Sequence, residues 1–178
     1  MEGDAYGMMR VGKFEKVSYE RFKEDLIGAM PHYSTVSDGD IRRIYDAIEL
    51  PSRATSGSAG YDIHSPLYAT VLPGEAVKIP TGIRVMIEEG WFLGCLPRSG
   101  MGFKYFVRLA NTMGVIDSDY YGSSNEGHIF VKLVNGGEEA VYINKGDSFA
   151  QAIFLPFGIT YEDDATGERD GGFGSTGR

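Results

Sequence analysis

The strongest chemical signal in the chain is a run of nine residues, Gly114-Val115-Ile116-Asp117-Ser118-Asp119-Tyr120-Tyr121-Gly122. Gly114 to Ile116 has the character of a strand end, and the acidic cluster after it predicts a turn that Gly122 closes. A carboxylate at such a turn lies at the rim of a pocket, where it can orient and deprotonate water. The alternative interpretation is an acidic hairpin turn with two surface tyrosines.

Three further segments place polar side chains beside or inside apolar strands. Pro97-Arg98-Ser99-Gly100 follows an apolar run, so its guanidinium and hydroxyl predict either a phosphate clamp or a plain turn. A strand start is predicted at Ala59-Gly60-Tyr61-Asp62-Ile63. The Asp62 carboxylate there either accepts hydrogen bonds from backbone amides or forms part of a ligand site. Phe149-Ala150-Gln151 sets an amide inside an apolar strand, where it must find a backbone or ligand partner.

The C-terminal segment is Gly171-Gly172-Phe173-Gly174-Ser175-Thr176-Gly177-Arg178. Its glycines free the backbone, its hydroxyls can bind phosphate, and its aromatic ring can stack. The segment therefore predicts either a lid over a phosphorylated aromatic ligand or a disordered glycine-rich terminus. It lacks the lysine and the following helix of a P-loop, which argues against an ATPase.

Composition narrows the class of protein. A chain of 178 residues is long enough for one domain with a packed core. A net charge of -8 and a pI near 4.9 argue against nucleic-acid binding. No apolar run approaches the ~20 residues of a membrane span, and no secretory signal is visible, so we expect a cytoplasmic protein without membrane contact. We expect Cys95 to be a buried strand residue, and the spacing of the three histidines predicts no zinc site.

The pattern of apolar residues changes near residue 50. Before it, Ser18 can cap a helix over residues 19–30, and Asp38 can cap a second over residues 40–49. The second helix carries an apolar stripe of Ile41, Ile44, Tyr45 and Ile48 that must pack on something. After it, short β-prone runs predict strands over 76–79, 83–87, 91–96, 129–134, 140–143 and 150–156. This texture predicts a mainly β fold, a jelly roll or β-barrel.

Taken in chain order, the segments 59–63, 97–100, 114–122, 149–151 and 171–178 resemble the first to fifth motifs of the trimeric dUTP pyrophosphatase (dUTPase) family. The resemblance covers about residues 50 to 178. The resemblance implies a jelly-roll homotrimer in which each active site gathers motifs from three subunits. It also implies hydrolysis of dUTP to dUMP and pyrophosphate by attack of water on the α-phosphate, which limits uracil in DNA. We divide the chain into a helical N-terminal extension (1–48), a β-rich core (49–160) and a flexible glycine-rich lid (161–178).

The resemblance also implies a role for each motif residue. Asp117 would be the base, Tyr120 would pack beneath the deoxyribose and exclude a 2'-hydroxyl, and Asp62 would support the network of water and magnesium. The uracil ring would be read by Asn111, Gly114, Val115 and Ile116. The phosphates would be held by Arg98, Ser99, Gly100 and Gln151. In the tail, Phe173 would stack on uracil, and the outer phosphates would meet Arg169, Gly174, Ser175 and Thr176. Mg²⁺ would be held through the triphosphate and water, without a direct protein ligand.

The chain departs from the family pattern at several positions. Ser148 stands where the fourth motif usually has an arginine, and Tyr121 replaces a polar or basic residue. Residues 123–128 form a short insertion after the third motif, in which Asn125-Glu126-Gly127 predicts a longer hairpin. Residues 1–48 match nothing in the core family, and we expect their helices to pack on the trimer exterior or to bind a protein partner.

Two other functions remain open at this point. A dCTP deaminase of the same superfamily would need a glutamate base and an arginine in its own motif, whereas this chain has the Asp117-Ser118-Asp119-Tyr120 pattern. A nucleotide-sensing regulator would bind dUTP and use residues 1–48 to engage a partner.

Overall fold

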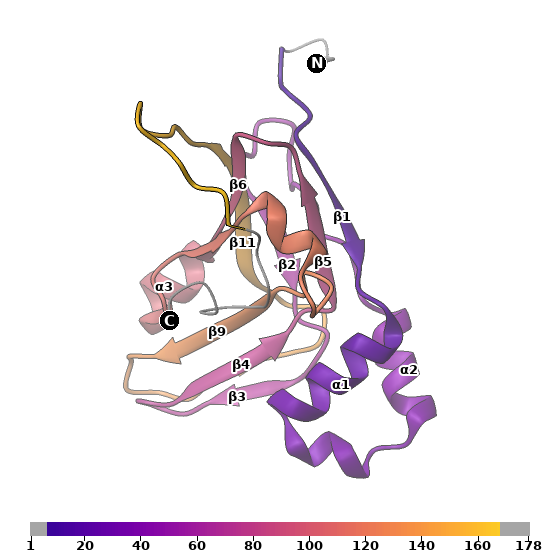
Figure 1. Ribbon diagram of the computed structural model, residues 1–178. Coiled ribbons are helices and arrows are strands. Elements are labelled where there is room, and N and C mark those ends of the chain that lie inside the picture. Colours follow the sequence, from indigo (N-terminus) through magenta and orange to yellow (C-terminus); the bar gives the residue numbers. More distant parts are fainter. Residues whose placement is uncertain (1–6, 168–178) are drawn as a thin grey trace.

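The computed structural model describes residues 7–167, and they form a mainly β protein (Figure 1). The strands are β1 (Gly12–Lys16), β2 (Tyr61–His64), β3 (Ala69–Val71), β4 (Ala76–Pro80), β5 (Ile83–Ile87), β6 (Trp91–Pro97), β7 (Val107–Leu109), β8 (Gly114–Ile116), β9 (Phe130–Asn135), β10 (Val141–Ile143) and β11 (Ser148–Pro156). The helices are α1 (Tyr19–Ala29), α2 (Asp38–Asp46) and α3 (Ser99–Tyr105), with 3-10 turns η1 (Pro31–Thr35) and η2 (Ser118–Gly122). No helix of the described part is long and apolar enough to cross a bilayer.

The described strands pair into four small sheets rather than into a closed barrel. The sheet orders are β2-β11-β6-β8, β4-β9-β7, β10-β3 and β1-β5. Alternation of apolar and polar residues explains why the strands bury one face: in β9, Val131 and Leu133 are buried while Lys132 between them is exposed. These jelly-roll-like sheets enclose one hydrophobic cluster.

Every strand predicted from the sequence is confirmed, with bounds that shift by at most two residues. Cys95 is buried in β6, and this burial raises the pKa of its thiol to about 12, as suits a core residue and not a nucleophile. The sequence did not predict β1, β3, β7 or α3. The strand β1 lies in the segment predicted to be helical, and it pairs antiparallel with β5.

The two N-terminal helices are confirmed, with one correction. Ser18 caps α1, and its side chain accepts a hydrogen bond from the Arg21 amide. The second helix is capped by Ser37 and not by Asp38, because Ser37 has an extended backbone and its hydroxyl accepts from the amide of Asp40. Asp38 is the first helical residue, and its carboxylate instead accepts from the Tyr19 hydroxyl at 2.6 Å.

The helices α1 and α2 pack on the β structure and share its core (Figure 1). Phe22 and Leu26 of α1 are fully buried, and α1 packs against β4. The apolar residues predicted for the second helix do face the core, since Ile41 and Ile48 are buried. The helix ends at Asp46 and not at residue 49, so Ile48 lies just beyond it. Gly82, between β4 and β5, has a φ of +73°, and a Cβ there would lie 2.3 Å from the Ile48 side chain. Only glycine therefore allows this close approach of the helical segment.

His128 joins α1 to the β core through both ring nitrogens. Its Nε2 accepts a hydrogen bond from the Gly82 amide at 2.8 Å, so Nδ1 carries the proton and donates to Asp25 Oδ2 at 2.6 Å. The ring is fully buried. Burial lowers the pKa of His128 below its usual value, although the nearby Asp25 carboxylate opposes the shift.

We expect acid to weaken the fold through His128. The folded-state pKa of His128 lies below the unfolded value near 6.5. The contribution of His128 to the free energy of unfolding is therefore complete above about pH 6.5 and is lost as the pH falls from there through the folded-state pKa. The measurement is urea unfolding at pH 7.5 and 5.5 for the wild type and His128→Gln, with the exposed His32→Gln as the matched control. His128→Gln should lose part of the pH dependence, and equal pH dependence in all three proteins would contradict this.

Candidate active site

The sheet β2-β11-β6-β8 brings together two predicted phosphate-site residues, Arg98 and Gln151, and the predicted supporting residue Asp62. Asp62 on β2 lies opposite Gln151 on β11, and Gln151 lies opposite Leu96 near the end of β6. Arg98 directly follows β6, and its guanidinium meets the Asp62 carboxylate through Nε at 3.2 Å and Nη2 at 3.3 Å. Gln151 Nε2 donates to the Pro97 carbonyl at 3.3 Å. These contacts place the first, second and fourth motifs side by side.

The chain around Arg98 remains accessible to a ligand. Arg98 is 46% exposed despite its ion pair, and Ser99 and Gly100 at the start of α3 are exposed. A cavity of about 190 Å³ lies beside Arg98, and its lining also includes Tyr142, Asp147 and Ser148. Residues 97–100, predicted to be either a phosphate clamp or a plain turn, are thus the end of β6 followed by the start of the short helix α3.

The third motif begins at β8, whose Gly114 and Ile116 are buried while Val115 is 48% exposed. Asp117 follows as the residue that precedes and caps η2, and it is half-buried. Asn111 is exposed in the turn that joins β7 to β8. Because β7 pairs with β9 and β8 pairs with β6, this segment connects two sheets.

Tyr120 is buried within η2, and its ring belongs to the hydrophobic cluster. Its hydroxyl donates to the His128 carbonyl at 2.8 Å and accepts from Asn125 Nδ2 at 2.7 Å. Sequence reasoning did not assign Asn125 and His128 to the site. The only sequence feature that could have indicated their role is that both lie in the insertion directly after the third motif.

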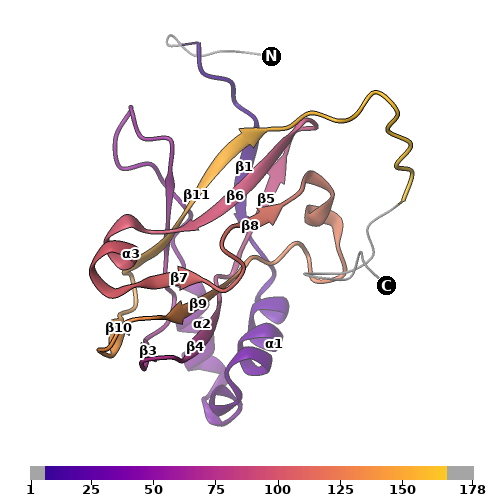
Figure 2. The same cartoon turned by 90° about the vertical axis from the view of Figure 1, so that its left-hand side faces the viewer.

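The residues around Arg98 and the turn that carries Asp117 lie at opposite ends of β6. The strand β8 runs antiparallel to β6, with Gly114 opposite Cys95 and Ile116 opposite Leu93. Continuing this register puts Asp117 beside Phe92, six residues before Arg98, a separation of about 20 Å along an extended strand. Figure 2 shows the same arrangement, with α3 on one side of the sheet and the turn after β8 on the other. One chain does not bring Asp117 to Arg98.

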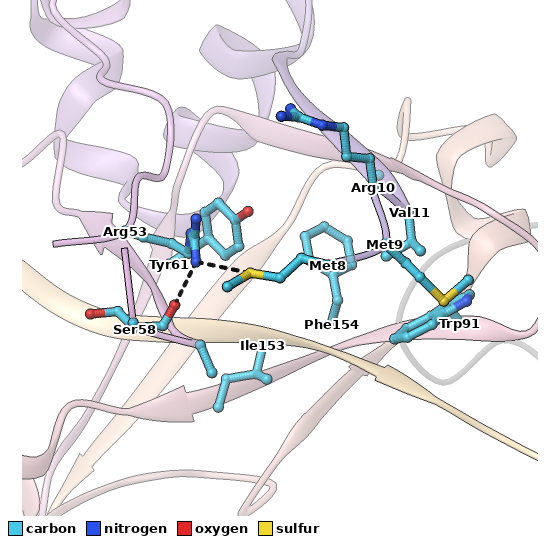
Figure 3. A pocket seen from close by; sticks show the side chains of 13 residues that line it. Met8, Met9, Arg10, Val11, Arg53, Ser58, Tyr61, Trp91, Ile153 and Phe154 are labelled. Carbon is cyan, nitrogen blue, oxygen red and sulfur yellow. Dashed lines mark hydrogen bonds between the residues drawn. The ribbon is translucent and has the colours of Figure 1, made fainter. Parts of the chain in front are cut away.

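A separate cavity of about 520 Å³ lies between the N-terminal segment and the first motif (Figure 3). Its lining includes Met8, Met9, Tyr61, Trp91 and Phe154. Arg53 donates to the Ser58 carbonyl at 3.1 Å. None of the predicted site residues lines this cavity. The predicted tail residues lie outside the described residues: Arg169, Phe173, Gly174, Ser175 and Thr176.

Comparison with known proteins shows which family this chain resembles. A family profile described as dUTPase matches residues 46–177. The deoxyuridine 5'-triphosphate nucleotidohydrolase of Lactococcus lactis is 42% identical over 133 residues, which cover 73% of this chain and 89% of the relative. The protein of the same name from Escherichia coli is 38% identical over 144 residues, covering 76% of this chain and 92% of the relative.

Solved structures show the same fold. The dUTPase of Streptococcus mutans has a TM-score of 0.58 and 36% identity, over 62% of this chain and 88% of that chain. A dUTPase of Staphylococcus bacteriophage 80alpha with dUpNHpp has a TM-score of 0.61 over 89% of this chain and 98% of that chain, at 17% identity. The profile match, the relatives and the shared fold together show that the chain belongs to the dUTPase family.

Proposed function

We propose that Asp117 is the general base with which this chain, a dUTP diphosphatase, hydrolyses dUTP to dUMP and pyrophosphate. The observation that carries the function is the family match over residues 46–177, which includes all five motifs. Asp117 accepts a proton from water as the water oxygen bonds to the α-phosphorus. The bond from that phosphorus to the bridging oxygen breaks, and pyrophosphate leaves. The half-buried position of Asp117 after β8 supports this role, because packing on one side fixes the carboxylate.

The deoxyribose and uracil are proposed to lie against the third motif. The buried ring of Tyr120, anchored at its hydroxyl, would form a rigid surface under the sugar that leaves no room for a 2'-hydroxyl. Asn111 and the backbone of residues 114–116 would read the base. The exposure of Asn111 supports this contact.

The phosphates are proposed to bind at the cluster around Arg98. A guanidinium held in plane by two contacts to Asp62 is preorganised for anionic oxygens, and the exposed Ser99 and Gly100 add a hydroxyl and amides. Gln151 would orient the same group through its Pro97 contact. In the tail, we propose that Arg169, Gly174, Ser175 and Thr176 contact the outer phosphates and that Phe173 stacks on the base.

Magnesium fits this site as an ion that arrives with the triphosphate. Asp62 is engaged by Arg98, and residues 7–167 contain no group of three or more histidine, cysteine or acidic side chains placed to hold a metal. Mg²⁺ keeps several waters and commonly binds through substrate phosphates. When bound, it neutralises phosphate charge, while Asp62 would orient the surrounding water.

The active unit is proposed to be a homotrimer in the cytoplasm. The separation of about 20 Å between Asp117 and Arg98 supports assembly, because a second copy can supply the cluster that one chain holds too far away. A role for residues 1–48 in binding a protein partner, and the boundary at residue 48, stay predictions.

Release of pyrophosphate from dUTP with Mg²⁺, measured beside dCTP, dTTP and UTP, tests the function. We expect hydrolysis confined to dUTP. Uracil nucleotide formed from dCTP would indicate a deaminase instead, and dUTP binding without any hydrolysis would indicate a nucleotide-sensing regulator.

A further inference from the structure

The inserted segment Ser123–His128, which we call the connector loop, holds Tyr120 from one side. The Tyr120 hydroxyl lies between the His128 carbonyl and Asn125 Nδ2. The Ser123 hydroxyl lies 2.7 Å from both the Tyr120 carbonyl and Asn125 Oδ1. The ring of Tyr120 is therefore positioned at its far end by the connector loop.

Close packing leaves the connector loop little freedom to move relative to η2. Gly127 has a φ of +69°, and a Cβ there would lie 2.8 Å from the Tyr120 carbonyl oxygen and 2.8 Å from the Tyr121 Cα. The strands on either side of the connector loop belong to different sheets, so it is not the longer hairpin predicted from the sequence. A displacement of the connector loop must move the backbone of η2.

The other side of the connector loop holds helix α1. The Glu126 carboxylate accepts from the Ser18 amide at 2.8 Å and from the Ser18 hydroxyl at 2.6 Å. His128 donates to Asp25 of the same helix. Glu126 itself has a φ of +60°, a conformation that is unfavourable for a glutamate and persists only where its surroundings hold it. The bonds to Ser18 provide that restraint.

A second path joins the same region to β1. The Tyr121 hydroxyl donates to Glu15 Oε2 at 2.6 Å, and the Arg84 guanidinium lies 3.9 Å from the centre of the Tyr121 ring. Glu15 and Arg84 lie opposite each other on β1 and β5. Tyr121, which departs from the family pattern, thus fastens η2 to the strand that leads into α1.

We propose that Glu126 is a positioning residue for substrate selection: by binding Ser18 it holds the connector loop, and through it the Tyr120 ring, in the position that excludes a 2'-hydroxyl. This inference rests on the proposed role of Tyr120 beneath the deoxyribose. Helix α1 lies before residue 46, where the family match begins, so this restraint is an addition of this chain to the family core. The helical segment therefore acts on substrate selection as well as on stability.

The test is the ratio of kcat/KM for UTP to kcat/KM for dUTP in the full-length protein. Glu126→Ala removes both hydrogen bonds to Ser18. We expect the ratio to rise about tenfold, because the Tyr120 ring is then held less firmly beneath the sugar. Glu126→Gln can still accept from the Ser18 amide, so its ratio should stay within about twofold of the wild type. The matched control is Ser37→Ala, which removes the cap of α2 but touches neither the connector loop nor η2, and its ratio should not change.

The outcomes separate this inference from the proposed function. A wild type that hydrolyses dUTP, with an unchanged ratio in Glu126→Ala, would overturn the inference alone. An equal rise in Ser37→Ala would also overturn it, because general destabilisation would then explain the change. A wild type without dUTP hydrolysis would overturn the proposed function and the inference together. If Glu126→Ala does not fold, Ser18→Ala takes its place, with an expected rise of about threefold.

Discussion

We expect replacement of Asp117 by Asn to lower the turnover of dUTP by roughly 10² to 10⁴, while dUTP still binds, because the amide cannot take the proton from water. The change keeps the size of the side chain at the start of η2. Pyrophosphate release gives the turnover, and calorimetric titration with a non-hydrolysable dUTP analogue gives the affinity.

The neighbouring Asp119 supplies the matched control for Asp117. It lies in the same turn but is exposed, so Asp119→Asn should cost less than about tenfold in turnover. Undiminished hydrolysis by Asp117→Asn, or a larger loss from Asp119→Asn, would remove Asp117 from the role of base.

Chains that carry Asp117→Asn and chains that carry Arg98→Ala, each nearly inactive alone, should regain activity when they assemble together. A shared site takes its base from one copy and its phosphate cluster from another, so random mixing in equal amounts leaves about a quarter of the sites intact. The reason is the separation of about 20 Å between the two groups in a single chain. Co-expression in equal amounts with one shared affinity tag, followed by purification and pyrophosphate assay, measures the recovery.

A double variant provides the control for this experiment. Wild-type chains mixed equally with Asp117→Asn/Arg98→Ala chains should retain about a quarter of the activity if sites are shared, and about half if each chain forms its own site. No recovery from the two single variants, together with half activity in this control, would show that the site lies within one chain.

The N-terminal helices are joined to the β core and to the region of Tyr120. The helices α1 and α2 bury Phe22, Leu26 and Ile41 in the same cluster as the β strands, so they are part of the folded body. Ser18, the cap of α1, binds Glu126, and Asp25 of α1 binds His128, so α1 is held to the connector loop, which also carries the anchors of Tyr120. A segment outside the family match is thus joined to the residue proposed to select the sugar.

The sequence by itself determined the local elements and the family. Alternating or continuous apolar runs specified the strands, and Ser18 specified the start of α1, because burial on one face and a side-chain cap are properties of neighbouring residues. The order of the five motifs was enough to assign the dUTPase family, which the comparisons confirm. It also located Asp117 at a turn after a buried strand end.

Only the tertiary structure decided which distant segments meet. The strand β1 forms because β5 offers a partner edge, and short segments such as Gly12–Lys16 show little of this in their own sequence. The contacts of Glu126 with Ser18, of His128 with Asp25 and of Asp62 with Arg98 join residues far apart along the chain. Such pairings depend on how the sheets stack and in which register, a property of the whole fold that no local pattern contains. The same register placed Asp117 and Arg98 at opposite ends of one strand.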